Sequence, residues 1–543
     1  MNENGIVNYD LLIKNAKLID GTGNPWFKGD IGISGDSISK IGRLDRETAD
    51  KTIDAAGKIA APGFIDIHGH SDLSILADPL CKSKIHQGVT TEVTGNCGHS
   101  GFPIKEDRLE ELKKTYSFMG DAGIEWDWRS PEDYFNKVES QGISMNIAPL
   151  LGHGTLRIAA MGFDDRPPND DEKKNMNQMV REAMEAGAFG LSSGLIYPPG
   201  SYSSTEELID LCKTVSGFDG IYSSHVRGES DSVIEAFEEA IEIGEMAGVG
   251  VQISHHKIAG KQNWGRSKES LKTIMDARAR GIDVTSDQYP YTAGSTGLGS
   301  LLPDWAHEGG TEQLLDRIKD DQTRERIKKD IKEDRIEGWW NPLKSSGWEN
   351  VMVVGFNTKA NKRFEGKTLA EIAEERGEGN YENLFNLLLE EEAGVRMILF
   401  MMDPDDVATI LKHPTTMIGT DGRALSPEGI LAEGKTHPRA YGTYPRILGK
   451  YVREKEVLPL EEAIRKMTSL PAQKLGLKDR GLLREGYRAD LVIFDPEKII
   501  DRSTYQDPHK LPEGISHVTV NGKLVVENSE HKQIRTGEVI KKP

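Results

Sequence analysis

The stretch GFIDIHGH, residues 63–70, begins a pattern that recurs along most of the chain. It is a short apolar segment that ends in small or polar residues. Between most of these apolar segments lie helix-like segments. Their apolar residues recur with a period near 3.6, and a glycine ends each of them. Strand and then helix, eight times over, predicts an α/β fold of the (β/α)₈ barrel type. The other seven segments are TTEVTGNCG (90–98), NIAPLLGHG (146–154), GAFGLSSGL (187–195), GIYSSHVRG (220–228), VGVQISHHK (249–257), GIDVTSDQYPY (281–291) and TTMIGTDG (415–422).

The two ends of the chain differ in texture from the barrel pattern. Residues 9–60 and 480–527 alternate in short β-like pieces, and the Asn521-Gly522 pair is typical of a hairpin turn. We therefore predict one small β domain from residues 1–61 plus 480–543, and a catalytic barrel over residues 62–479. Long insertions in compact domains are usually functional, so residues 296–400 are predicted to form a helical insertion, or lid, between strands 7 and 8.

The composition argues against several classes of protein. Of the 543 residues, 37% are hydrophobic and 29% charged, as in ordinary globular proteins, and no apolar run reaches the roughly 18 to 20 residues of a membrane span. A net charge of −19 repels nucleic acid and anionic lipid surfaces, so neither is an expected partner. The first residues lack a basic segment followed by an apolar one, so we expect a cytoplasmic location. We expect a monomer or small homo-oligomer that acts on a small-molecule N-acyl amino acid.

Histidines and an aspartate lie at the ends of the predicted strands. His68 and His70 are two residues apart in the first strand, so strand alternation directs both side chains to one side. His225 ends the fifth strand, His255 the sixth and Asp421 the eighth. A barrel of this type gathers the carboxyl ends of its strands at one face, and this set of residues at that face predicts a metal site. The alternative is five unrelated polar residues at strand ends.

Cys97 ends the second predicted strand, beside the histidines of the first. A thiol loses its proton when it coordinates a divalent ion, and a thiolate with imidazoles favours zinc over magnesium or calcium. The chain has only three cysteines, which makes a disulfide framework improbable. Cys81 and Cys212 fall within helix-like stretches and are expected to be small buried apolar side chains.

Six blocks of the sequence resemble the amidohydrolase superfamily and, within it, the D-aminoacylase (N-acyl-D-amino-acid deacylase) family. The resemblance runs over nearly the whole chain, and the cysteine block and the last block are its most specific parts. Many relatives carry a carboxylated lysine at the fourth strand, where this chain has GLSSGL (190–195). The resemblance implies that Cys97 supplies a thiolate in place of that lysine. The blocks are APGFIDIHGHSD (61–72), TGNCG (94–98), GLIYPPG (194–200), ISHHK (253–257), MIGTDG (417–422) and HPRAYGTYPRILGKYVRE (437–454).

The resemblance also implies which residues bind metal. It assigns a tightly held zinc ion, Zn²⁺, to Cys97, His225 and His255. His68 and His70 match the ligands of a second, often weaker site, so one ion or two remain open. Zinc lowers the pKa of a bound water and polarises an amide carbonyl, and both effects favour hydrolysis.

Further roles follow from the same resemblance. Asp421 matches the catalytic aspartate, which would accept a proton from water and deliver it to the departing amine. Lys257, Tyr289, Ser295 and Arg439 match residues around the α-carboxylate of an N-acyl amino acid. Arginine offers a fork that fits a carboxylate and lysine a point charge, so this assignment is chemically sensible.

The residues after Ser295 bear on the choice of substrate. Relatives that accept acidic side chains place an arginine shortly after that serine, whereas this chain reads STGLGSLLPDW (295–305). A pocket around Leu301 and Leu302 therefore predicts a neutral, apolar substrate side chain, such as that of methionine or leucine. The segment between Asp421 and Arg439 is longer than the histidine-rich loop of the D-aminoacylases, and it also borders the site.

Three functions stay open at this stage. The first is zinc-dependent hydrolysis of the amide bond of N-acyl-D-amino acids. The second is hydrolysis of another linear or cyclic amide or dipeptide, although the missing lysine at strand four argues against hydantoinase and dihydroorotase types. The third is a non-catalytic barrel scaffold without metal, against which the retention of the whole ligand set argues.

Overall fold

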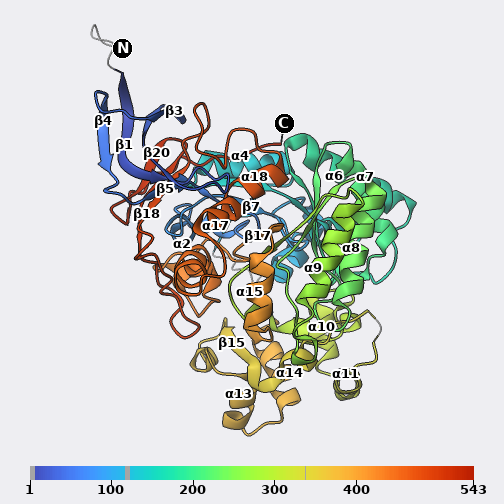
Figure 1. Cartoon of the computed structure of the whole chain (residues 1–543). Coiled ribbons are helices and arrows are strands. Elements are labelled where there is room, and N and C mark those ends of the chain that lie inside the picture. Colours follow the sequence, from blue (N-terminus) through green and yellow to red (C-terminus); the bar gives the residue numbers. More distant parts are fainter. Residues whose placement is uncertain (1–6, 117–122, 337, 543) are drawn as a thin grey trace.

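The computed structural model of the chain describes residues 7–116, 123–336 and 338–542 (Figure 1). The prediction about a secretory leader concerns the first residues of the chain, and residues 1–6 lie outside the described ranges. Within the described ranges, no helix is both long enough and apolar enough to cross a membrane.

The eight predicted strand segments form a closed parallel barrel, which confirms the predicted fold class. The first and last strands are joined where the Asp421 amide donates to the His68 carbonyl (2.8 Å) and the His70 amide to the Gly422 carbonyl (3.0 Å). Strand 3 has two parts, β8 and β9, and the Leu150 amide between them donates to the Thr94 carbonyl (2.9 Å). The strands are β6 (Phe64–Asp66), β7 (Val89–Thr94), β8 (Asn146–Pro149) with β9 (Leu151–Gly152), β10 (Gly190–Gly194), β11 (Ile221–His225), β12 (Gly250–Ile253), β13 (Val284–Gln288) and β17 (Thr416–Ile418).

Helices cover the outside of the barrel, and Figure 1 shows α6 to α9 side by side along one flank. Local sequence explains their ends. The Asn169 side chain accepts hydrogen bonds from the first-turn amides of α6, and Gly187 ends the helix in the left-handed region at φ 109°. These helices bury their apolar faces against the strands, so the strand ends are held in place. Their bounds are α5 (His153–Met161), α6 (Asp170–Ala186), α7 (Thr205–Ser216), α8 (Val233–Ala247), α9 (Ser267–Ala279), α15 (Pro404–Lys412), α16 (Arg439–Arg446), α17 (Leu460–Met467) and α18 (Ser469–Leu475).

Both ends of the chain contribute to a single nine-stranded sheet. The N-terminal and C-terminal parts join where β5 pairs antiparallel with β18, with Ala60 opposite Ile493. The sheet agrees with the expectation that the two ends lie together, while the domain limits at residues 61 and 480 stay a prediction. Its strands are β1 (Asn8–Leu18), β2 (Phe27–Ser34), β3 (Ser37–Gly42), β4 (Thr48–Asp54), β5 (Ile59–Pro62), β18 (Leu491–Phe494), β19 (Ile515–Val520), β20 (Lys523–Glu527) and β21 (Glu530–His531).

Between strands 7 and 8 the chain forms an insertion with an apolar core of its own. It contains helices, as expected, and also an antiparallel sheet in the order β14-β16-β15 that the sequence analysis missed. Apolar runs of five residues do not distinguish a strand from a buried helix turn. The insertion lies at the opposite end of the molecule from the nine-stranded sheet (Figure 1). Its elements are β14 (Ala293–Gly297), α10 (Thr311–Arg317), α11 (Asp321–Glu333), α12 (Pro342–Ser346), β15 (Val351–Gly355), α13 (Leu369–Arg376), α14 (Asn380–Glu390) and β16 (Arg396–Phe400).

Candidate active site and metal centre

A cleft lies at the carboxyl ends of the barrel strands, with an empty volume of about 930 Å³ that includes its open mouth. Pockets of this size suit small molecules. Of the ten predicted site residues, nine line the cleft: His70, Cys97, His225, His255, Lys257, Tyr289, Ser295, Asp421 and Arg439. The remaining one, His68, is fully buried behind the cleft residue Cys97, with 3.3 Å between His68 Nε2 and Cys97 Sγ. The structure therefore brings all the predicted site residues together.

Cys97, His225 and His255 form a buried group of donor atoms. His255 Nε2 lies 3.4 Å from Cys97 Sγ and 2.9 Å from His225 Nδ1. Burial acts to raise the pKa of Cys97, but the charges of His68 and His255 outweigh it and hold that pKa well below its usual value. A thiolate and two imidazoles that face one another suit a zinc ion, whose tetrahedral ligands stand about 3.5 Å apart. The group therefore fits zinc.

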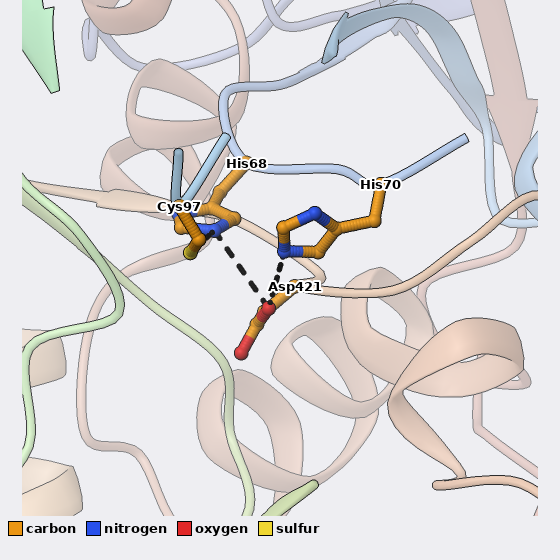
Figure 2. A group of neighbouring side chains, drawn as sticks. All are labelled: His68, His70, Cys97 and Asp421. Carbon is orange, nitrogen blue, oxygen red and sulfur yellow. Dashed lines mark hydrogen bonds and ion pairs between the residues drawn. The ribbon is translucent and has the colours of Figure 1, made fainter. Parts of the chain in front are cut away.

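A second group shares Cys97 with the first and adds His68, His70 and Asp421 (Figure 2). Asp421 Oδ1 lies 3.0 Å from His70 Nε2 and 3.7 Å from His68 Nε2. The other ring nitrogen of His68 is held by Asp287, with 3.3 Å between His68 Nδ1 and Asp287 Oδ2. A carboxylate behind a ligating imidazole fixes the ring orientation in many metal sites.

The backbone at this site adopts conformations that non-glycine residues rarely take. Cys97, His255 and Asp421 have φ angles of 54°, 34° and 48°. Left-handed backbone of this kind costs energy outside glycine and is concentrated at functional sites. Beside Cys97, a side chain on Gly95 would place its Cβ 2.0 Å from the Leu150 carbonyl oxygen, so only glycine fits. The chain thus directs these side chains toward the cleft.

Glu229 is a buried member of the site that the sequence analysis missed. Its Oε1 accepts a hydrogen bond from Lys257 Nζ (2.5 Å) and lies 3.2 Å from His255 Nδ1. Burial acts to raise the pKa of Glu229, but the charges of Lys257 and His225 outweigh it and lower that pKa. Glu229 lies four residues after His225, just past the end of a strand. This position does not by itself distinguish a site residue from an ordinary loop residue.

The predicted carboxylate-binding residues line the same cleft as Asp421. Arg439 Nη1 lies 2.7 Å from Asp421 Oδ2, and its guanidinium stacks over the Tyr289 ring at 4.8 Å. Within the described residues the Tyr289 hydroxyl has no hydrogen-bond partner, although it is buried in the cleft wall. The Ser295 hydroxyl, by contrast, donates to the Met397 carbonyl (2.8 Å).

The protonation of Asp421 follows from these neighbours. Burial acts to raise the pKa of Asp421, but the Arg439 guanidinium, His255 and His70 outweigh it and hold that pKa well below its usual value. Asp421 is therefore a carboxylate at neutral pH, oriented by one partner on each oxygen.

Leu301 and Leu302, which suggested a neutral substrate side chain, do not line this cleft. Leu301 packs in the core of the insertion. Leu302 lines an adjoining cavity that shares His99, Ile196, Tyr197 and Thr296 with the cleft. The prediction that Leu301 and Leu302 form the pocket wall is therefore wrong for this cleft.

Comparison with known proteins agrees with the geometry. The pattern described as "Amidohydrolase family" matches residues 51–526. The D-aminoacylase of Alcaligenes xylosoxydans xylosoxydans is 37% identical over 539 residues, which cover 98% of this chain and 97% of that protein. These matches confirm the resemblance noted in the sequence.

Two solved structures are also similar over 98% of this chain and 100% of their own. One is an N-acyl-D-glutamate deacylase from Bordetella bronchiseptica in complex with zinc and a phosphonate that mimics the tetrahedral intermediate, at 33% identity and a TM-score of 0.81. The other is a D-aminoacylase with a binuclear metal centre, described as having one-metal activation and second-metal attenuation, at 36% identity and a TM-score of 0.82.

Proposed function

Because this chain belongs to the amidohydrolase family, we propose that it is a zinc-dependent hydrolase that cleaves the amide bond of N-acyl-D-amino acids. The products are a carboxylate and a free D-amino acid. The observation that carries the proposal is the buried group of Cys97, His225 and His255 beside the ionised Asp421. The chain is similar over nearly its whole length to a D-aminoacylase and to an N-acyl-D-glutamate deacylase.

In this proposal Cys97, His225 and His255 hold the tightly bound zinc, and His68 and His70 contribute to a second, weaker site. When bound, zinc lowers the pKa of water and polarises the amide carbonyl. One ion is sufficient for activity, as described for the similar D-aminoacylase.

Asp421 transfers the proton. Its ionised carboxylate lines the cleft and belongs to the donor group that shares Cys97 with the proposed zinc ligands. It accepts a proton from the attacking water and delivers it to the nitrogen, which would otherwise have to leave as an amide anion. Arg439 and His70 keep the carboxylate oriented for both steps.

Lys257, Arg439 and Tyr289 bind the α-carboxylate of the substrate. The ammonium and guanidinium groups attract it, and the Tyr289 hydroxyl supplies a donor that the described residues leave unused. Ser295 forms part of the wall beside them, where Arg439 Nη2 donates to its carbonyl (3.3 Å). The cytoplasmic location and the monomeric or small oligomeric state stay predictions.

The test measures free amino acid released from the N-acetyl forms of D- and L-methionine and of D- and L-glutamate. Zinc-loaded protein and chelator-treated protein are compared. The proposal predicts release from at least one D substrate, loss of that release after chelation and its recovery with zinc. Zinc-loaded protein that releases no amino acid from any D substrate would contradict it.

A further inference from the structure

Lys84 is a fully buried lysine that has no part in the chemistry proposed above. It lies in α2 (Lys82–Ile85), a single turn that precedes β7, and its side chain has no exposed surface. Two buried carboxylates flank its ammonium group, with Nζ 2.6 Å from Asp66 Oδ2 and 3.0 Å from Glu92 Oε2. Burial acts to lower the pKa of Lys84, but these carboxylates outweigh it and raise that pKa, so the lysine is charged at neutral pH. Because Lys84 has no surface in the cleft, it can act on a reaction only through its neighbours.

The ammonium group of Lys84 is bonded to the residues on both sides of Asp421. Its three protons go to Asp66 Oδ2, to the Thr420 hydroxyl (2.7 Å) and to the Gly422 carbonyl (2.9 Å). The Thr420 hydroxyl in turn donates to Asp66 Oδ2 (2.7 Å), and the Gly422 amide donates to that hydroxyl (3.0 Å). The Thr420 amide donates to Asp66 Oδ1 (2.9 Å). Asp421 therefore lies on a segment whose two neighbouring residues are both fixed by one buried cation.

The same network fixes the strand end that carries His68 and His70. Asp66, which precedes them, accepts a hydrogen bond from the His68 amide through Oδ1 (3.3 Å). Glu92 accepts hydrogen bonds from both the amide (3.0 Å) and the hydroxyl (2.8 Å) of Ser71, the residue after His70. The carboxylates that flank the lysine thus hold the histidine segment from both ends.

The backbone at this point is strained and closely packed. Asp421 has a φ of 48°, and such a conformation persists outside glycine only where the surroundings impose it. Gly69, between the two histidines, lies so close to Glu92 that a Cβ there would be 2.0 Å from Glu92 Oε1, so only glycine fits. The hydrogen bonds around Lys84 supply the constraint that this geometry requires.

Stability alone does not account for a lysine at this position. A buried ion pair seldom stabilises a fold more than well-packed apolar side chains of similar volume would. Its hydrogen bonds are directional, however, and apolar packing does not replace that property. Within the described residues, the hydrogen bonds of Lys84 include none to the residues assigned to the substrate α-carboxylate.

We propose that Lys84 is a positioning residue that holds Asp421 in the orientation needed for proton transfer, in register with the two histidines of the first strand. The inference rests on the proposed function, because it concerns the proton-transfer step of that reaction. A displacement of about 1 Å at a reacting group can lower a rate by about 100-fold. Loss of the ammonium group therefore acts on kcat, whereas substrate affinity is little changed.

The first test compares Lys84→Met with Lys466→Met, both zinc-loaded, on an N-acetyl-D-amino acid that the wild type hydrolyses. Lys466 is the matched control, because it is also a fully buried lysine that fixes β17, but at the opposite end of that strand. We expect kcat of Lys84→Met to fall about 10- to 100-fold while KM stays within about threefold of wild type. Lys466→Met should keep kcat within about threefold of wild type, although both variants lose stability in urea. Lys466 Nζ donates to the carbonyls of Leu411 (2.8 Å), His413 and Thr416 (3.0 Å).

The second test uses Thr420→Val and Thr420→Ser, and it decides the question alone if Lys84→Met does not fold. Valine keeps the shape of threonine without the hydroxyl that links Lys84 to Asp66, whereas serine keeps the hydroxyl. We expect Thr420→Val to lower kcat by about tenfold or more and Thr420→Ser to stay within about threefold of wild type. Zinc content, measured by elemental analysis, should be unchanged in all variants.

The outcomes separate this inference from the proposed function. If Lys84→Met or Thr420→Val is folded and zinc-loaded and keeps kcat within about threefold of wild type, Lys84 only supports the fold and the inference is overturned, while the proposed function stands. A rise in KM without a fall in kcat, or an equal fall in kcat in Lys466→Met, overturns it as well. If zinc-loaded wild-type protein hydrolyses no N-acyl-D-amino acid, the proposed function is wrong and the positioning role falls with it.

Discussion

The substitution Asp421→Asn tests the proton-transfer role most sharply, because an amide has the shape of a carboxylate without its charge or basicity. In the structure Oδ2 lies 2.7 Å from Arg439 Nη1 and Oδ1 lies 3.0 Å from His70 Nε2. An asparagine keeps one acceptor oxygen for these two partners and presents its NH₂ group to the other. The variant therefore loses the proton carrier and one of the two contacts.

The expected magnitudes differ between catalysis and stability. Loss of a general acid and base lowers kcat by about 10²- to 10⁴-fold, which corresponds to about 3 to 5 kcal/mol in the activation barrier. Weakening the charged contact with the mostly buried Arg439 lowers the free energy of unfolding by about 1.5 to 3 kcal/mol. The zinc content should not change, because Cys97, His225 and His255 are intact.

The assay combines kcat on an N-acetyl-D-amino acid, zinc measured by elemental analysis, and unfolding in urea. Asp276→Asn on the exposed side of α9, with a side chain 57% exposed, controls for the removal of an acidic charge. An Asp421→Asn variant whose kcat stays within about threefold of wild type, with zinc fully bound, would refute the proton-transfer role. Loss of zinc together with activity would instead make Asp421 a ligand.

Three other substitutions test the ligands, the substrate site and the packing beneath them. Cys97→Ala should lose the tightly bound zinc and all turnover, and elemental analysis after dialysis that finds full zinc content would contradict the assignment. Lys257→Met should lower kcat/KM by about tenfold or more by removing a cation from the α-carboxylate site, as steady-state kinetics will show. Glu207→Gln should lower the free energy of unfolding by about 3 to 5 kcal/mol, because the buried Arg157 loses its carboxylate. Burial acts to raise the pKa of Glu207, but His153 and Arg157 outweigh it and lower that pKa below the usual 4.5. The wild type should therefore keep this stabilisation above pH 4.5 and lose it as the pH falls through the lowered pKa, whereas the variant should show a weaker dependence in urea titrations over the same range.

The repeating strand-and-helix pattern was sufficient to predict the barrel, because each strand is a short apolar run closed by small or polar residues. The same pattern placed His225, His255 and Asp421 at one face, since parallel strands in a barrel all end there. The gathering of these candidate residues at one face was therefore predictable from their order in the sequence.

What escaped prediction depends on tertiary contacts that leave no local pattern. Glu229 lies in a loop after β11, and only the fold brings its carboxylate to Lys257. Arg396 lies within the insertion, and its approach to the cleft depends on the sheet β14-β16-β15. Leu301 was assigned to the pocket from its distance along the chain, whereas packing places it in the insertion core.

The measurement that tests the central claim most directly is a zinc titration of chelator-treated protein, followed by the rate of amino acid release from the N-acetyl-D-amino acid substrate. Wild-type protein and Cys97→Ala are titrated side by side. We predict that the wild-type rate rises from near zero to a plateau at about one equivalent of zinc, while the variant stays inactive throughout. Hydrolysis by wild-type protein that needs no zinc, or equal activation of Cys97→Ala, would contradict the account.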